Sequence, residues 1–390
     1  MDENRAFIHT LELSKRITRE ELDILNKATG SFPLGKNSKE TQYQWKSVKY
    51  CVDGIQLLYK FCSEQEKKKQ GYLPYRLNLI WNPSKSIRRG SHINVIHTES
   101  EMEEAIWQLE RKIKEIFTIP GLDTYELNDF KLSRIDFTID RKGIPPQIME
   151  QIINVLWKMN RAYGFHENEQ LQEKCRNFKR NRSFNVVNQS QDIEFVIYNK
   201  GEAVKDQKYP EEIQEYFQDT LRIELRCGRK YIRTLSKKGW DTTRSIQKLY
   251  QDAERNIKNM YQRIFMYSTH VSFLSYNVME KLLYMYFQNK RKCPKRLEKM
   301  LQVVRQMTLK STKNLGEELD RLFPSAKQKN TVQNYFLECN VSPIPLDNMN
   351  PYLQSLDSLL GFYHVEEQER RLKRFAEKHT RGKEVFWYED

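Results

Sequence analysis

Two short segments, RIDFTID at residues 134–140 and TLRIELR at residues 220–226, decide the expected fold of this chain. In both segments apolar and charged side chains alternate, which is the period-2 pattern of a β-strand with one buried face. The apolar side chains are Ile135, Phe137 and Ile139 in the first segment and Leu221, Ile223 and Leu225 in the second. We therefore expect two strands that each bury one face and present a charged face on the other side.

The charged faces of these strands combine carboxylates with arginines. Asp136, Asp140 and Glu224 would repel one another on neighbouring strands unless a hard cation lay between them, and Mg²⁺ or Mn²⁺ held by carboxylate oxygens activates phosphodiesters. The alternative is a set of salt bridges between these acids and the arginines of the same strands, Arg134, Arg222 and Arg226. The spacing alone leaves both interpretations open.

The composition favours a polyanionic partner. The chain has 390 residues, a formal net charge of +14 and a pI near 9.3, and this balance favours DNA or RNA. Its six cysteines include no C-x-x-C pair, which argues against a zinc ribbon and against a disulfide framework.

The first residues, MDENRAFIHTLEL, do not resemble a signal peptide, and no apolar run approaches the length of a membrane span. We expect a soluble, cytoplasmic protein with no membrane association.

The order of predicted elements indicates an α+β domain over residues 1–240. Strand, helix, strand, strand, helix, strand is the order of a ferredoxin-like unit, and further strands extend a mainly antiparallel central sheet. Strands are expected at 6–13, 46–58, 75–81, 134–140, 183–188, 192–198 and 220–226, and helices at 18–28, 99–117, 146–163 and 210–217. Thr18 is the expected N-cap of the first helix.

Residues 241–390 have a different pattern. Amphipathic helical stretches are expected at 243–266, 276–289, 294–309, 314–322, 329–338 and 364–379, with a proline-rich turn at 343–351. We therefore expect an all-α C-terminal domain that serves DNA recognition or oligomerisation.

Two further segments could take part in chemistry. YNKGE at 198–202 follows directly on a predicted strand, and Lys200 there could neutralise a scissile phosphate, although the segment is also an ordinary turn. Tyr231 lies seven residues after Glu224 in ELRCGRKYIRTL, where neighbouring cations would favour attack by its phenolate. The alternative is that Tyr231 only packs, because the chain has 21 tyrosines.

In this order, RIDFTID, YNKGE and LRIELR resemble the core motifs of rolling-circle replication initiators of plasmids and conjugative transposons, and of the related relaxases. The resemblance covers roughly residues 75–235. Asn199 stands where the family has an aspartate. The resemblance implies a metal-dependent, site-specific endonuclease: a tyrosine attacks one strand of an origin, leaving a 5′-phosphotyrosyl enzyme and a 3′-hydroxyl that primes rolling-circle replication or conjugative transfer.

The resemblance also implies roles for individual residues. Asp136 and Glu224 would bind Mg²⁺ or Mn²⁺, with Asp140 as a third ligand or a structural acid. Lys200 would contact phosphate, supported by Glu202, and Tyr231 would be the nucleophile with Tyr198 as the alternative. Origin DNA, single-stranded or in a hairpin, is the expected partner, and a host helicase and a second copy of the chain are further expected partners.

Basic residues indicate where DNA would bind. Besides Arg134, Arg222 and Arg226, two clusters are expected to contact the strand: Lys174, Arg176, Lys179, Arg180 and Arg182, and Lys290, Arg291, Lys292, Lys295 and Arg296. Basic runs are also common on ordinary solvated surfaces.

A different class of function stays open. The same scaffold could belong to a non-catalytic, sequence-specific DNA-binding protein. An RNA-binding sheet is disfavoured because the strands lack paired exposed aromatic residues.

Overall fold

The computed structural model describes residues 5–33, 44–61, 75–87, 95–168, 182–265, 270–288, 294–308, 314–347 and 352–362. The chain divides into two compact units. Unit 1 comprises residues 1–157 and 161–264, and unit 2 comprises residues 158–160 and 265–390.

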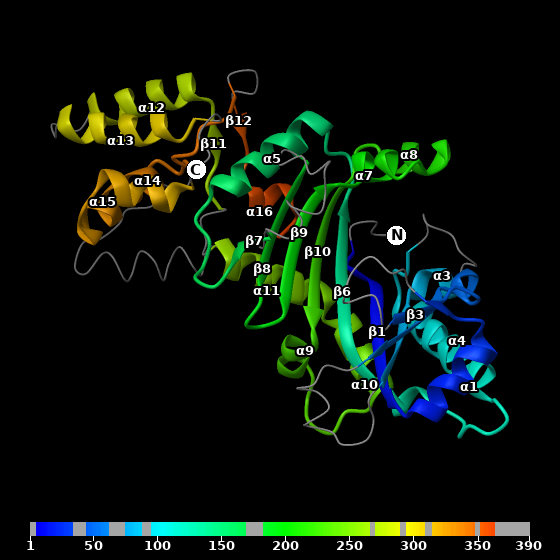
Figure 1. The fold of residues 1–390 in the computed structure, drawn as a ribbon. Coiled ribbons are helices and arrows are strands. Elements are labelled where there is room, and N and C mark those ends of the chain that lie inside the picture. Colours follow the sequence, from blue (N-terminus) through cyan, green and yellow to red (C-terminus); the bar gives the residue numbers. More distant parts are fainter. Residues whose placement is uncertain are drawn as a thin grey trace. The chain divides into compact units, whose positions relative to one another are not determined.

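Unit 1 contains a ten-stranded sheet and the helices that pack with it (Figure 1). Its strands are β1 (Phe7–Ile17), β2 (Phe32–Pro33), β3 (Gln44–Ser47), β4 (Ile55–Phe61), β5 (Tyr75–Trp81), β6 (Lys131–Arg141), β7 (His166–Glu167), β8 (Ser183–Asn188), β9 (Ile193–Asn199) and β10 (Leu221–Gly228). Its helices are α1 (Arg19–Thr29), α3 (Pro83–Ile87), α4 (Glu99–Phe117), α5 (Pro146–Lys158), α7 (Lys200–Asp206), α8 (Glu211–Tyr216), α9 (Arg229–Leu235), α10 (Thr242–Gln251) and α11 (Ala253–Phe265), with short 3-10 turns at Cys51–Asp53 and Leu127–Asp129.

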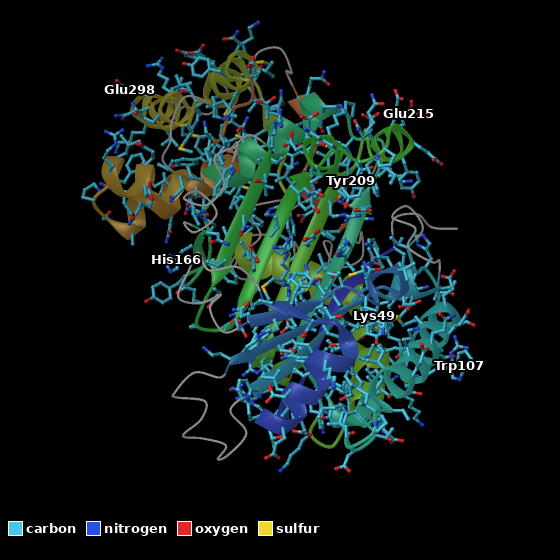
Figure 2. The ribbon with its side chains drawn as sticks, turned by 45° about the vertical axis from the view of Figure 1, so that its right-hand side comes forward. Lys49, Trp107, His166, Tyr209, Glu215 and Glu298 are labelled. Atoms are coloured by element: carbon cyan, nitrogen blue, oxygen red, sulfur yellow. The ribbon has the colours of Figure 1, made fainter. Side chains whose placement is uncertain are left out.

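The strands lie in the order β2-β3-β4-β5-β1-β6-β10-β9-β8-β7, and every neighbouring pair is antiparallel. The expected mixed fold with a large antiparallel sheet is therefore confirmed. The segments RIDFTID and LRIELR lie in β6 and β10, which are neighbours at the centre of the sheet. Figure 2 shows the side chains on this sheet, with His166 marking its β7 edge.

One face of the sheet is apolar and is covered by helices. The Trp157 ring of α5 meets Phe184 of β8 with 4.9 Å between centroids, and Tyr261 of α11 meets Phe195 of β9 at 6.5 Å. On the other half of the sheet, the hydroxyl of Thr29 in α1 hydrogen-bonds that of Tyr59 in β4 at 3.0 Å. Ile135, Phe137, Ile139 and their β10 counterparts Leu221, Ile223 and Leu225 are fully buried on this face, as the alternation predicts.

Helix starts follow local capping chemistry. Thr18 and Thr98 each accept a hydrogen bond from the third residue of the following helix, and Glu21 and Glu101 there bond back to the cap residue. This reciprocal arrangement satisfies backbone donors that a helix start leaves free. The expectation for Thr18 is confirmed, and α4 has the predicted bounds of 99–117.

Unit 2 is mainly helical, with α12 (Tyr276–Gln288), α13 (Pro294–Gln306), α14 (Leu315–Leu322), α15 (Ala326–Glu338) and α16 (Leu356–Leu359). It also contains a two-stranded sheet of β11 (Phe273–Leu274) and β12 (Tyr352–Leu353), so this unit is not purely helical. The helix expected at 364–379 lies outside the described residues.

The compact unit built on the sheet extends beyond residue 240. The single helix expected at 243–266 is two helices, α10 and α11, and both belong to unit 1. Within the part of the chain that the structure describes, no helix combines the length and the apolar character needed to cross a bilayer.

Candidate active site on the central strands

The polar face of the unit 1 sheet is its second face, opposite the helix-covered one. On β6 it carries Arg134, Asp136, Thr138 and Asp140, and on β10 it carries Arg222, Glu224 and Arg226. Residues opposite one another in an antiparallel pair share a face, and the register pairs Arg222 with Asp140, Glu224 with Thr138 and Arg226 with Asp136. Asp136 and Glu224 are therefore diagonal neighbours on the same face, as a shared cation requires.

Each predicted metal ligand accepts hydrogen bonds from an arginine. Asp140 is held by both arms of Arg222, with Nε and Nη2 at 2.6 and 2.7 Å from its two oxygens. Asp136 is held by Arg134 at 2.8 and 2.6 Å. Arg226 donates to Glu224 at 2.6 Å. The salt-bridge alternative is thus the arrangement that this structure adopts, and Asp140 and Arg222 form its cross-strand pair.

The three ion pairs differ in exposure. The side chains of Arg222 and Asp140 are 3% and 9% exposed, whereas Arg134 and Arg226 are 43% and 31% exposed over nearly buried carboxylates. Arg226 also reaches Glu194 of β9 at 3.2 Å. A cation that binds Asp136 and Glu224 could therefore displace Arg134 and Arg226 into solvent, whereas Arg222 and Asp140 are both buried.

The protonation of the carboxylates follows from these contacts. Burial alone would raise the pKa of Glu224, but the charge of Arg226 outweighs it, together with further cationic neighbours, and lowers that pKa to about 2. For Asp136, burial raises the pKa despite the bonds from Arg134, and the nearby charge of Glu224 raises it further. Because this repulsion between the two acids is mutual, a cation between them would relieve both.

Thr138 is a further polar residue beside Asp136 and Glu224. Its side chain is fully buried between Asp136 and Asp140 along β6, directly opposite Glu224. Its hydroxyl has no hydrogen-bond partner among the residues that the structure describes. A buried hydroxyl without a partner is costly, so such atoms are informative about ligands or water.

Of the three predicted ligands, Asp136 and Glu224 are the two whose positions would allow them to share a divalent cation. Asp136, Glu224 and the Thr138 hydroxyl lie together beneath displaceable arginines, whereas both oxygens of Asp140 are taken by a buried partner. Among the described residues, no three His, Cys, Asp or Glu side chains come together in a group that could hold a metal.

Lys200 lies at the end of β9, as the sequence indicates, and begins α7. Burial, with the charge of Arg222, lowers the pKa of its ammonium to about 8. The ammonium lies 5.3 Å from the centre of the Phe217 ring, and no ion pair to it occurs among the described residues. Asn199 caps α7 by accepting from the Glu202 backbone at 3.0 Å, as an aspartate would.

Gly201 is needed where α7 meets the segment before β10. A Cβ at this position would lie 2.7 and 2.8 Å from the backbone oxygens of Gln218 and Phe217. The absence of a side chain lets the chain approach closely there, which keeps Lys200 next to the strand that holds Arg222.

The two candidate tyrosines lie in different surroundings. The Tyr198 hydroxyl donates to Glu224 at 2.7 Å, and burial together with the charge of Glu224 raises its pKa. Tyr231 lies on α9, where burial and the nearby Cys227 raise its pKa, although the charge of Arg263 on α11 acts in the opposite direction. The structure thus joins Tyr198 to the carboxylates, and it places Tyr231 beside Cys227 and Arg263 instead.

His9 belongs to this site, although it was not predicted from the sequence. The register between β1 and β6 shifts between Ile8 and Thr10, so His9 is the extra residue of a bulge. Burial and the charge of Arg222 lower its pKa to about 4, and Glu224 and Lys200 are also among its charged neighbours. Two successive polar residues, His9 and Thr10, inside an otherwise alternating strand are the signal that could have revealed the bulge.

The predicted DNA contacts are placed only in part. Arg182 forms ion pairs with Glu202 at 3.0 Å and with Asp206 at 3.3 Å. Lys295 and Arg296 lie at the start of α13. The other members of the two clusters lie outside the described residues: Lys174, Arg176, Lys179, Arg180, Lys290, Arg291 and Lys292.

Comparison with known protein families shows a match. The model of the Phage_CRI family, described as the N-terminal part of a replication-associated protein, matches residues 24–252. The match covers more than half of the chain and includes β6, β9, β10 and α9. No match was found among curated proteins.

Proposed function

This chain belongs to the Phage_CRI family of replication-associated proteins, and we propose on that basis that it nicks one strand of an origin by tyrosine transesterification. The family is one of rolling-circle replication initiators, so the resemblance noted in the sequence is confirmed and the protein is a replication initiator that acts on DNA. The nicking chemistry is our inference.

The observation that most supports the proposal is that Asp136 and Glu224 are diagonal neighbours on adjacent central strands. Both lie on the polar face, their charges repel each other, and the unpartnered Thr138 hydroxyl lies with them. Two carboxylates close to each other in a buried place are more frequent at functional sites than elsewhere.

We infer that Asp136 and Glu224 hold one Mg²⁺ or Mn²⁺ ion, and that Asp140 does not. When bound, this ion would polarise the scissile phosphodiester. Arg134 and Arg226 neutralise the carboxylates in its absence and become available for phosphate contacts when they are released. Asp140 instead fixes Arg222 at the base of the site.

The reaction needs one bond to form and one to break. The tyrosine hydroxyl gives its proton to solvent as its oxygen attacks phosphorus, the bond from phosphorus to the 3′-oxygen breaks, and the leaving oxygen takes a proton from solvent to become the 3′-hydroxyl primer. The charge of Lys200 is available for the phosphate because no carboxylate is paired with it among the described residues. We assign the attack to Tyr231, with Tyr198 as the alternative, and we infer that Tyr198 orients Glu224.

Other expectations for this protein stay proposals. The strand order β4-β5-β1-β6, with α1 and α4 in the connections, supports a ferredoxin-like unit over residues 7–141. Conjugative transfer in place of replication, DNA recognition or oligomerisation by unit 2, a host helicase and a homodimer are proposed without a specific contact.

One observation favours the second candidate function, a non-catalytic DNA-binding protein. Each of the three acids is neutralised by an arginine in this structure, which is what a structural polar face would require. The two functions differ in whether DNA becomes covalently attached.

The test of the function is a nicking assay. Purified protein and Mn²⁺ are incubated with supercoiled DNA carrying the origin of the element that encodes the protein. We expect relaxed circles that retain protein in detergent, with the 5′ end of the nick blocked and the 3′ end extendable by a polymerase. Binding without nicking, or a nick with free 5′ phosphate, would favour the non-catalytic function or a different chemistry.

A separate prediction concerns the metal. Asp136→Asn and Glu224→Gln are each expected to weaken Mn²⁺ binding by at least about tenfold, because each removes a charged ligand. Isothermal titration with the metal alone measures this. Glu194→Gln is the matched control, since Glu194 lies on the same face and also accepts from Arg226, but is not proposed as a ligand. Equal affinities in all three variants would place the ion elsewhere.

A further inference from the structure

The segment that follows β10 is strongly basic. From residue 229 to residue 244 it contains one acidic residue, Asp241, and six cations: Arg229, Lys230, Arg233, Lys237, Lys238 and Arg244. We refer to residues 229–244 as the α9–α10 basic segment, because it spans α9, the connecting loop and the first turn of α10. Figure 1 shows α9 immediately beyond the end of β10.

The exposed cations of this segment have no carboxylate partner in the part of the chain that the structure describes. Arg233, Lys237, Lys238 and Arg244 are all exposed. Lys237 and Arg244 instead lie 6.0 and 5.8 Å from the centre of the Trp240 ring. The carboxylate of Asp241 accepts from the Arg244 backbone at 2.7 Å and caps α10. This differs from the central strands β6 and β10, where Arg134, Arg222 and Arg226 each have an acidic partner.

Positive charge also converges at the start of the segment. Arg229 reaches back to β1, where its Nη2 donates to the Ser14 hydroxyl at 2.8 Å. Burial lowers the pKa of Arg229, and the charges of Arg233 and Arg16 lower it further. Like charges held together in this way are stabilised by a bound anion.

We propose that the α9–α10 basic segment binds the backbone of single-stranded DNA beside the nicking site. The proposal rests on the proposed function, since it identifies the path of the strand that is cut. A row of exposed cations around an aromatic ring is the combination that binds single strands, with phosphates on the cations and a base on the ring. The segment also begins with the helix that carries Tyr231, so a strand bound along it passes the expected nucleophile.

The test compares two triple variants that each remove three positive charges. The first is Arg233→Gln with Lys237→Gln and Lys238→Gln. The control is Lys27→Gln with Lys49→Gln and Lys114→Gln, three exposed lysines on other elements of unit 1. Binding of a fluorescein-labelled single-stranded oligonucleotide is followed by anisotropy at several salt concentrations, with no divalent ion present so that no cleavage occurs.

For the first variant we expect about a tenfold loss of affinity and a salt slope smaller by about 2, because each lost phosphate contact on a single strand reduces the slope by about 0.7. The control variant is expected to keep the wild-type slope. Equal changes in both variants, or no change in the first, would overturn the proposal, as would a loss confined to the duplex form of the same oligonucleotide. Circular dichroism and the melting temperature check that both variants fold.

The assay separates this proposal from the nicking function. Binding is measured in Tyr231→Phe protein as well, which lacks the expected nucleophile. If the wild-type protein never forms a covalent adduct but the first triple variant still loses binding, the nicking function fails and the binding surface stands. If nicking is observed and binding is unchanged in the triple variant, the surface proposal fails alone.

Discussion

Replacement of Tyr231 by phenylalanine is expected to abolish the covalent adduct with DNA and to reduce nicking by at least about a thousandfold. The reason is that the substitution removes the attacking oxygen and little else, and loss of a nucleophile is among the most costly changes in an enzyme. Detergent-resistant attachment of protein to a labelled origin strand measures the adduct directly. The Tyr231 side chain is not fully buried, so the variant is expected to fold.

The surroundings of the two tyrosines favour Tyr231 as the nucleophile. The positive charge of Arg263 opposes the effects of burial and of Cys227 on the pKa of its hydroxyl. The Tyr198 hydroxyl is bonded to Glu224, whose negative charge opposes formation of a phenolate. Because Tyr231 lies beside Cys227 and Arg263, the proposed attack requires its hydroxyl to move from there to a phosphate bound at Asp136 and Glu224.

Tyr198→Phe is the matched control for this experiment. It is expected to retain the adduct but to slow its formation by about tenfold, because the charged Glu224 carboxylate loses the hydrogen bond that the Tyr198 hydroxyl donates to it. The opposite result, an adduct in Tyr231→Phe and none in Tyr198→Phe, would assign the attack to Tyr198. An adduct in both single variants would mean either that the two tyrosines can replace each other or that a third tyrosine reacts, and an adduct in the double variant would identify the second case.

A close backbone contact between Gly228 and Asp192 fixes the start of α9. Gly228 is the N-cap of α9, and a Cβ there would lie 2.0 Å from the Asp192 carboxylate. The Gly228 backbone also donates to the Asp192 backbone oxygen at 2.8 Å. The turn before β9 and the start of α9 are therefore fixed to each other through a residue without a side chain.

Local patterns in the sequence predict much of the fold because their causes are local. The alternation in β6 and β10 and the capping residues Thr18 and Thr98 depend on neighbours a few residues away. The apolar stripe of residues 243–266 likewise predicts helical structure, and α10 and α11 occupy it. The surface against which these helices pack is not set by neighbouring residues, so the sequence pattern did not predict that both helices belong to unit 1.

The partners within the site depend on register, which the sequence does not specify. Whether Asp140 faces a metal or Arg222 is decided by the alignment of β6 against β10, and the observed register places these two side chains opposite each other. The bulge at His9 likewise depends on how β1 aligns with β6. The residue types were therefore predictable, and their pairing was not.

The pairing of Asp140 with Arg222 leads to the second large prediction, which concerns stability. Asp140→Asn is expected to lower the free energy of unfolding by about 3–5 kcal/mol, because it leaves a buried guanidinium without its counter-charge. Two short hydrogen bonds, of 2.6 and 2.7 Å, join the pair. Burial alone would lower the pKa of Arg222, but the charge of Asp140 raises it above its ordinary value. A guanidinium does not lose its proton in a protein, so Arg222 stays charged in the variant. Urea denaturation followed by circular dichroism measures the loss.

Two further variants test whether the loss of stability comes from the unpaired charge of Arg222. Asp140→Leu combined with Arg222→Met removes both charges, and its stability is expected to lie within about 1 kcal/mol of the wild type, because an apolar pair of similar size can replace a buried ion pair. Phe7 and Phe217, whose rings lie 5.8 and 5.5 Å from the guanidinium, already provide apolar surroundings. Glu194→Gln, in a partly exposed pair, is expected to cost less than about 1 kcal/mol. If Asp140→Asn instead kept full stability and lost Mn²⁺ binding, Asp140 would be a metal ligand, and the assignment of the ion to Asp136 and Glu224 alone would be wrong.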